Sequence, residues 1–278
     1  MLIKGNPGKA VNSAYNLPPN QVFLAELIVA IESSAVKHGA GSSFYSPSSM
    51  QCIRQMYYKR TGEPRDASPV NYGDVGCAAT GTARHEHIQD ALIYLSKGSS
   101  RFKYIDVAEY VNHKQRVGKC TQLILGPKLG AEQQLIDEKR HIRFQCDGII
   151  YDIQDKEFYL FEFKNQISFK ALNKQSVDVA HHNQVAIYCA ELDLNKALVT
   201  YEDRNSCTLY VPEVFEVTDY EKARIYEKVD SCENMVKQAI IPARPDDLSS
   251  ATCRYCNYKS KCKADGKEAR SNGTNIIK

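Results

Sequence analysis

Apolar residues alternate with polar ones most clearly between residues 140 and 166, where the sequence reads RHIRFQCDGIIYDIQDKEFYLFEFKNQ. Two apolar runs flank a short polar turn, and this pattern predicts a pair of β-strands. Side chains alternate faces along a strand, so residues two apart point the same way. The residues expected on one face are Phe158, Leu160, Glu162 and Lys164, and those on the other, against the protein body, are Tyr159, Phe161 and Phe163. A carboxylate and an ammonium at the end of an apolar face need a partner or a ligand.

Helical spacing of apolar residues, together with capping residues, predicts helices in other parts of the chain. These helices are expected at about residues 20–38, 46–60, 81–98, 176–192 and 220–240. The second would contain Cys52, and the third would place His85 on or beside its inward face. Further strands are expected at 104–111, 121–126, 131–136, 197–202 and 207–217, with a loop at 61–80. Strands interspersed with helices predict an α/β (α+β) fold with a central sheet.

The composition is that of a soluble globular protein, with 278 residues, 25% charged and 43% hydrophobic. The net charge of +3 permits nucleic-acid binding but does not require it. The longest apolar run, residues 22–31, is interrupted by Glu26 and is too short to span a bilayer. The N-terminus lacks the residue order of a signal peptide. We therefore expect an intracellular, cytoplasmic protein without membrane association. The sequence leaves open whether a cell, a virus or a phage encodes it.

Ten cysteines are many for an intracellular protein, and three of them cluster near the C-terminus. Cys253 and Cys256 form a CxxC pair, and Cys262 follows after five residues. In a reducing compartment such a cluster more often binds a metal than forms disulfides. No histidine follows His182, so a fourth ligand must come from upstream, and Cys52 is the natural choice. Four thiolates fit zinc or a 4Fe–4S cluster, whereas the singly spaced cysteines are expected to be buried apolar residues.

The carboxylates of Asp147 and Glu162 form a candidate metal site. Their pattern with Lys164 is short, and a surface salt bridge is the ordinary explanation for it. Apolar neighbours favour a metal, because a buried charge needs a ligand. Two carboxylates suit Mg²⁺ or Mn²⁺, and Lys164 could orient a metal-bound water or neutralise a phosphate. His85 is either an ordinary core histidine or a third ligand that shifts the preference toward Mn²⁺.

Gln184 and Tyr188 lie four residues apart in a predicted helix and therefore share a face. They are either ordinary residues of an amphipathic helix or a surface that hydrogen-bonds a phosphate or a nucleotide. The predicted helix at 46–60 also carries basic residues that could contact DNA phosphates, namely Arg54, Lys59 and Arg60.

These segments follow one another in the order Cys52, GTARH (81–85), Asp147, EFK (162–164), QVAIY (184–188) and C-x2-C-x5-C (253–262). The order resembles the RecB-like branch of the PD-(D/E)xK nuclease superfamily that carries an iron–sulfur cluster. Members of that branch include the CRISPR-associated exonucleases of adaptation modules and the AddB nuclease domain. The resemblance covers about residues 45–263. It departs from the superfamily pattern in one place, because Asp147 is preceded by Cys146 and not by the proline that the PD motif has before its aspartate.

The resemblance implies a restriction-endonuclease-like core, in which a mixed sheet is flanked by helices and an iron–sulfur cluster staples the helical N-terminal part to the C-terminal region. It divides the chain into an N-terminal extension with a helix (1–40), a nuclease domain (41–263) and a flexible tail (264–278). It implies a metal-dependent DNA nuclease, acting as an exonuclease on single-stranded or resected ends in recombination, repair or DNA processing.

The resemblance also implies a role for each motif residue. The metal ligands would be His85, Asp147, Glu162 and the backbone carbonyl of Phe163, with Asp147, Glu162 and Lys164 as the catalytic residues. The ligands of the 4Fe–4S cluster would be Cys52, Cys253, Cys256 and Cys262, with structural zinc as the alternative. The residues beside the DNA would be Gln184 and Tyr188, helped by Arg54, Lys59 and Arg60.

Two other functions fit parts of the sequence. A non-catalytic DNA-binding or scaffold subunit of a recombination or integration complex could use the same fold as a clamp, although it has no need of the full catalytic set. A zinc-ribbon protein fits only the cysteines. No GxxxxGK loop of the kind that binds ATP phosphates occurs, so any unwinding of DNA would come from a helicase partner.

Overall fold

The structure, a computed structural model, describes residues 19–34, 43–66, 72–129, 132–166, 177–212, 214–246, 248, 250–254 and 256–271. The chain divides into two compact units, one formed by residues 1–40 and 67–83 and the other by residues 41–66 and 84–278. None of the helices in the described part of the chain is long and apolar enough to cross a membrane.

The first unit contains α1 (Pro19–Ser34), the predicted N-terminal helix, and the beginning of α3 (Tyr72–Gly98). The exposed residues of α1 include Phe23, Leu24 and Leu27. The expected loop at 61–80 is wrong from Tyr72 onward, because α3 begins nine residues before the predicted start at Gly81. Residues 1–18 of the expected N-terminal extension and residues 35–38 of its helix lie outside the described part of the chain.

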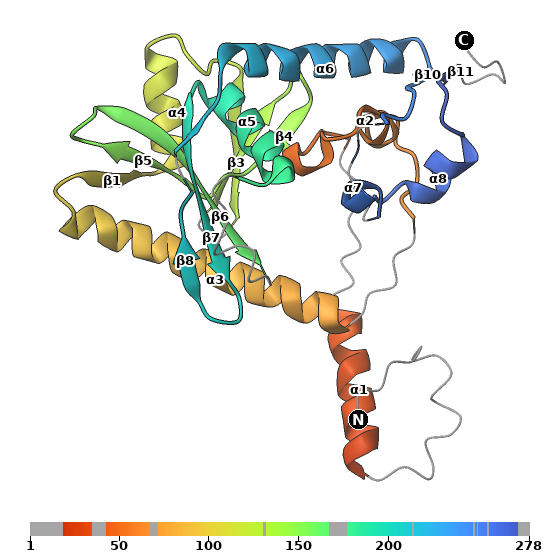
Figure 1. Cartoon of the computed structure of the whole chain (residues 1–278), viewed down its shortest axis with the longest axis horizontal. Coiled ribbons are helices and arrows are strands. Elements are labelled where there is room, and N and C mark those ends of the chain that lie inside the picture. The colour runs from red at the N-terminus through yellow and green to blue at the C-terminus, as the bar shows by residue number, and fades with distance from the viewer. Residues whose placement is uncertain are drawn as a thin grey trace. The chain divides into compact units, whose positions relative to one another are not determined.

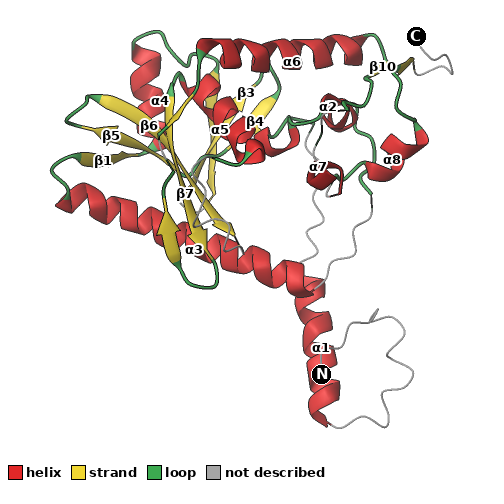
Figure 2. Ribbon diagram, in the orientation of Figure 1, coloured by secondary structure: helices red, strands yellow, loops and turns green. Residues whose placement is uncertain are grey.

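A six-stranded mixed sheet forms the centre of the second unit (Figures 1 and 2). Its strands are β1 (Phe102–Ile105), β5 (Gly148–Asp152), β6 (Glu157–Gln166), β7 (Lys196–Asp203), β8 (Thr208–Tyr210) and β9 (Phe215–Glu216). They run in the order β1, β5, β6, β7 and β8, with β9 also beside β7. The helices packed on the sheet are α3, α4 (Val107–Arg116), α5 (Val179–Leu192) and α6 (Asp219–Lys237). β6 and β7 are parallel, and the other neighbours are antiparallel.

β6 is a central strand that is buried on both faces, which explains its long apolar run. Tyr159, Phe161 and Phe163 pack with the C-terminal half of α3. Leu160 faces the larger core, to which α4, α5 and α6 contribute. The predicted alternation of the β6 side chains is therefore confirmed. So is the predicted fold class, since helices cover both faces of a mixed central sheet (Figure 2).

A second, antiparallel sheet contains β2 (Leu123–Leu129), β3 (Glu132–Asp137) and β4 (Ile142–Phe144). The segment before η3 (Pro47–Ser49) lies along β4, since the Tyr45 N–H donates to the His141 carbonyl at 2.6 Å. The Arg143 N–H donates in turn to the Tyr45 carbonyl at 2.8 Å. The N-terminal part of the second unit is thus fixed to the strand that leads into Asp147.

Two further predicted elements are wrong, and both errors lie at the beginning of a helix. The strand expected from Tyr104 ends at Ile105, where Asp106 caps α4 by accepting from the Ala108 N–H at 2.9 Å. The helix expected at 46–60 is interrupted, and Cys52 is the extended N-cap residue of α2 (Ile53–Arg60). At Asp106, local capping chemistry overrides apolar periodicity.

Arg54 joins α2 to the C-terminal region and is 0% exposed. Its Nε donates to the Pro242 carbonyl at 2.6 Å, and its Nη2 donates to the Lys267 and Glu268 carbonyls at 3.1 and 2.7 Å. Its guanidinium is therefore committed to backbone carbonyls, and the expectation that Arg54 contacts DNA is wrong. A buried cation keeps its charge only where such acceptors surround it.

The rest of the C-terminal region consists of short elements, namely β10 (Ile240–Ile241), α7 (Ser250–Arg254), α8 (Lys259–Ala264) and β11 (Arg270–Ser271). β11 pairs with β10. Residues 264–271 of the expected tail therefore belong to this region, and residues 272–278 lie outside the described part of the chain.

Glu191 of α5 gives the fold a testable pH dependence. It is 0% exposed, and burial and the nearby Asp137 raise its pKa to about 8. A carboxyl whose pKa is raised by folding stabilises the protein below its unfolded pKa, and this contribution is lost as the pH rises through about 8. We expect Glu191→Gln to be more stable than the wild type at pH 9, by roughly 1–3 kcal/mol, and the difference to shrink at pH 6.

Urea unfolding at the two pH values measures this difference. Glu227→Gln is the matched control, because Glu227 lies exposed on α6 and its substitution should change the free energy of unfolding equally little at both. A Glu191→Gln variant that is less stable than the wild type at pH 9 would contradict the prediction.

Candidate active site

Two paired strands bring the predicted acids together. β6 carries Glu162 and Lys164 two residues apart. Asp147 directly precedes β5, which pairs with β6. The backbone N–H of Phe163 donates to Asp147 Oδ2 at 2.6 Å. The strand that carries one acid therefore anchors the carboxylate of the other.

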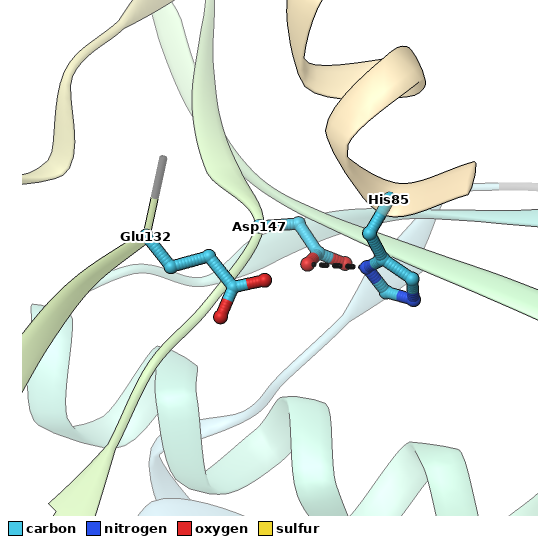
Figure 3. A group of neighbouring side chains, drawn as sticks. All are labelled: His85, Glu132 and Asp147. Atoms are coloured by element: carbon cyan, nitrogen blue, oxygen red, sulfur yellow. Dashed lines mark hydrogen bonds and ion pairs between the residues drawn. The ribbon is translucent and has the colours of Figure 1, made fainter. Parts of the chain in front are cut away.

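α3 contributes His85, whose Nδ1 lies 2.9 Å from Asp147 Oδ1 (Figure 3). The His85 ring meets the Phe163 ring edge-on, with 5.1 Å between the ring centroids. The preceding Arg84 pairs with the buried Glu202 of β7, which ties α3 to the sheet beside His85. Burial lowers the pKa of His85, but the hydrogen bond to Asp147 and its charge outweigh burial and raise that pKa overall.

The sequence analysis missed a third acid, Glu132, at the start of β3. Figure 3 shows its carboxylate turned toward Asp147 and His85. Ligand atoms of these three residues all lie within 4.8 Å of one another. Burial and the charge of Asp147 raise the pKa of Glu132. No sequence motif marks it, because Glu132 belongs to the other sheet and is brought to the site only by the tertiary fold.

Glu162 is the most confined group of the site, at 3% exposed. Its Oε1 accepts from Lys164 Nζ at 2.6 Å and from Gln184 Nε2 at 3.3 Å. Its Oε2 is buried and has no hydrogen-bond partner among the described residues. Burial and the nearby Asp147 raise the pKa of Glu162 to about 7, although Lys164 opposes the shift. A buried carboxylate oxygen without a donor costs free energy unless a cation satisfies it.

α5 places Gln184 and Tyr188 against these groups. Gln184 Oε1 accepts from Lys164 Nζ at 3.1 Å, and Gln184 Nε2 donates to the Tyr188 hydroxyl at 2.7 Å. Tyr188 is buried, and its ring stacks on Phe144 of β4 at 5.3 Å between centroids. Both residues therefore belong to the site. Gln184 contacts Lys164 and Glu162, and Tyr188 accepts a hydrogen bond that fixes the position of Gln184.

The donor set of the site fits a divalent cation. His85, Glu132 and Asp147 provide one imidazole and two carboxylates. Glu162 lies outside this close group, but the charge of Asp147 reaches it, and it offers a buried oxygen without a partner in the described part of the chain. Carboxylate oxygens suit Mg²⁺ and Mn²⁺, and the imidazole favours Mn²⁺. The residues present thus fit the predicted Mg²⁺ or Mn²⁺ site, and Glu132 extends it. The backbone carbonyl of Phe163 stays a predicted ligand.

The four predicted cluster cysteines are all free thiols in one region of the second unit. Cys52 caps α2, and burial together with the other three cysteines raises the pKa of Cys256. Arg54 Nη1 donates to Cys262 Sγ at 3.8 Å. A nearby cation favours the thiolate form that binds a metal, so the residue types fit a metal-bound group.

The spacing of these sulfur atoms differs from that of a zinc site. Tetrahedral zinc, with Zn–S bonds of about 2.3 Å, brings its sulfur atoms within about 3.8 Å of one another. No three cysteine sulfur atoms of the described residues lie within 4.8 Å of one another. The 4Fe–4S cluster and the zinc alternative both stay predictions.

Two other basic residues of α2 differ in their surroundings. Arg60 Nε forms an ion pair with Glu233 at 2.9 Å, and Arg60 Nη2 lies 2.9 Å from His141 Nε2. Its charge is therefore neutralised by α6. Lys59 Nζ donates to Ser46 Oγ at 3.0 Å and lies at a cavity. Of the three basic residues expected beside the DNA, Lys59 alone keeps an accessible charge without a carboxylate partner among the described residues.

Comparisons with known proteins yield structural likeness only. No protein-family model matches the chain, and no curated protein matches its sequence. The solved structure of SSO0001 is 16% identical and has a TM-score of 0.45 over 88% of this chain and 96% of that chain. The alkaline exonuclease LHK-Exo from Laribacter hongkongensis is 10% identical and has a TM-score of 0.43 over 75% of this chain and 92% of its own. At such scores none of these proteins assigns a function to this chain.

Proposed function

We propose that this protein is a metal-dependent nuclease that cleaves DNA. One observation carries the proposal, the environment of the Glu162 carboxylate. One of its oxygens accepts from Lys164 and the other has no partner among the described residues, beside the His85–Asp147 pair. A structural salt bridge gains little from burying an unsatisfied oxygen. A cation-binding acid next to a fixed lysine is suited to the hydrolysis of a phosphodiester.

The roles follow from the contacts. The residues that would hold Mg²⁺ or Mn²⁺ are His85, Glu132, Asp147 and Glu162. The bound cation would polarise the scissile phosphate and lower the pKa of the attacking water. Lys164 Nζ is held by Glu162 Oε1 at 2.6 Å and by Gln184 Oε1 at 3.1 Å. It therefore keeps a fixed position from which it can donate to an oxygen that gains negative charge during cleavage.

The resemblance to RecB-like nucleases supports the finer parts of the proposal. The substrate would be single-stranded DNA or resected DNA ends, degraded by an exonuclease in recombination, repair or DNA processing. Contacts to phosphate groups carry no sequence information, so cleavage should depend weakly on sequence. A helicase or a recombination or integration protein is the expected partner.

The same resemblance supports a structural 4Fe–4S cluster. Cys52 at the start of α2 and three cysteines of the C-terminal region would be its ligands, namely Cys253, Cys256 and Cys262. The cluster would join parts of the chain that Arg54 already connects through hydrogen bonds.

Labelled single-stranded and double-stranded DNA, incubated with the full chain and Mn²⁺ or Mg²⁺, test the proposed function directly. We expect cleavage with either ion, faster on substrates that have a single-stranded end, and no cleavage after chelation of the metal. Restoring Mn²⁺ to the chelated sample should restore cleavage.

The alternative role as a DNA-binding scaffold predicts a different result. A scaffold would shift DNA in a binding assay and leave it intact with every divalent ion. That result would contradict the nuclease proposal, and cleavage that persists after chelation would contradict the metal site.

A further inference from the structure

A polar cavity of about 300 Å³ lies in the second unit, away from the acids of the proposed active site. It is bounded by η3, α2 and the segment that leads into α8. The lining residues include Ser46, Ser48, Ser49, Lys59, Arg65 and Asn257. They offer hydroxyl, amide and cationic groups, and none of the described residues that line the cavity is acidic.

Positive charge accumulates at this cavity. Lys59 and Arg65 line it, and Arg143 of β4 lies near enough to act on Lys59. Burial and these two guanidinium groups lower the pKa of Lys59 to about 8. A lysine that is held between two other cations and withdrawn from water is unfavourable for the free protein. An anion bound in the cavity would remove this repulsion.

A carboxylate close to the cavity in sequence, that of Asp66, already has a hydrogen-bond partner. Asp66 follows Arg65, but its Oδ2 accepts from the backbone N–H of Ser260 at 2.9 Å. The backbone N–H of Asp66 donates to the Asn257 carbonyl at 2.6 Å. Asp66 thus fixes the wall of the cavity.

Serine hydroxyls complete the site. Lys59 Nζ donates to Ser46 Oγ at 3.0 Å, and Ser46 Oγ donates to Ser49 Oγ at 2.9 Å. Ser48 between them is exposed. Ser46 and Ser49 donate their hydroxyl protons to each other's oxygen atoms, so Lys59, with its further N–H groups, and the exposed Ser48 are the donors for the oxygens of a phosphate.

A short chain of contacts links the cavity to the proposed active site. Arg143 precedes Phe144, and the Phe144 ring stacks on the Tyr188 ring with 26° between their planes. Tyr188 accepts a hydrogen bond from Gln184, which in turn contacts Lys164. β4 therefore supplies both Arg143, whose charge acts on Lys59 at the cavity, and Phe144, which packs on the Tyr188 side chain behind Gln184.

We propose that the cavity at Lys59, Arg65 and Ser46 binds a phosphate group of the DNA strand that is being cleaved. This inference rests on the proposed nuclease function and adds a second point at which the protein holds its substrate. A phosphate held there would fix the strand relative to Lys164, and it could be internal or terminal.

DNA binding without cleavage tests the cavity separately from catalysis. Fluorescence anisotropy of labelled single-stranded DNA, with the metal chelated, gives the Kd at several salt concentrations. We expect Lys59→Gln and Arg65→Gln each to weaken binding by about 10-fold and to reduce the salt slope by about 0.7 for the lost contact. The matched control is Lys119→Gln, which removes the same charge from an exposed residue that pairs with Asp193 outside the cavity.

Folding is checked in the same variants. Lys59→Gln removes a charge that other cations repel, so its melting temperature should equal or exceed that of the wild type. Added inorganic phosphate should raise the melting temperature of the wild type and leave that of Lys59→Gln unchanged. Unchanged Kd values and salt slopes in both cavity variants would overturn the inference.

Two oligonucleotides of the same sequence, one with a 5′-phosphate and one with a 5′-hydroxyl, distinguish a terminal from an internal phosphate in the cavity. Stronger binding of the 5′-phosphate, lost in Lys59→Gln, assigns a terminal phosphate, whereas equal binding that Lys59→Gln weakens assigns an internal one. If the wild type cleaves DNA and the cavity variants bind and cleave as it does, only the inference fails. If the wild type binds DNA and phosphate through Lys59 but cleaves nothing, only the proposed nuclease function fails.

Discussion

Replacing Glu162 by glutamine is expected to slow DNA cleavage by roughly a thousandfold, about 4 kcal/mol in activation free energy, while DNA binding persists. The amide keeps the shape of the side chain and a hydrogen-bond acceptor for Lys164 but removes the negative charge from Oε2, the oxygen without a partner among the described residues. Single-turnover cleavage at saturating Mn²⁺ measures the rate, and anisotropy with the metal chelated measures binding. Cleavage at the wild-type rate would show that this residue is not a metal ligand.

Stability separates this explanation from a structural salt bridge. Breaking a buried ion pair that supports the fold costs about 3–5 kcal/mol. We expect a much smaller change for Glu162→Gln without metal, because the substitution also removes a buried oxygen that lacks a partner in the described part of the chain. The matched control is Glu202→Gln on β7, which breaks the pair between Glu202 and Arg84 and should destabilise the protein. Equal destabilisation by both substitutions would favour a structural role for Glu162.

Lys164→Ala should also abolish cleavage and spare DNA binding, because it removes the ammonium that Glu162 and Gln184 hold in place. A second control on the same strand is Glu157→Gln, whose carboxylate pairs with Lys196 and lies half-exposed. That variant should cleave DNA at the wild-type rate.

The alternation of residues along β6 made its two faces predictable from the sequence. A strand has only two faces, so the positions of Glu162 and Lys164 followed from their spacing alone. The four-residue spacing of Gln184 and Tyr188 likewise gave their common face on α5. The structure adds the partner of that face, since Gln184 contacts both charged residues of β6.

Residues whose role depends on a distant element were not predictable in this way. Glu132 joins His85 and Asp147 only because β3 of the second sheet begins at the site. Arg54 is the second residue of a basic helix and looks like a DNA contact, but its acceptors are carbonyls more than 180 residues away. Charge in a sequence shows neither burial nor partner, and both decide what a cation does.

The second large expected effect is that of replacing Cys52, one of the four predicted cluster ligands. Cys52→Ala should abolish cofactor binding and unfold the second unit. Structural metal binding contributes about 10–16 kcal/mol in small domains, which equals or exceeds the usual stability of a folded chain, about 5–15 kcal/mol. Protein purified without oxygen should be brown and contain about four iron atoms per chain, as a 4Fe–4S cluster requires. Circular dichroism and metal analysis of the wild type and the variant measure both effects.

Cys120→Ala is the matched control, because Cys120 is equally buried but lies before β2, away from the other cysteines. This variant should keep its iron and its fold, with at most the small loss expected for a core thiol. A colourless wild type with about one zinc per chain would contradict the 4Fe–4S assignment and leave the nuclease site untouched. Iron retained in Cys52→Ala would show that another residue is the fourth ligand. The expected result is the loss of both iron and fold in Cys52→Ala alone. The hydrogen bonds of Arg54 remain available in every variant, so they cannot account for this difference. The result would therefore show that the cofactor holds the start of α2 and the C-terminal region together.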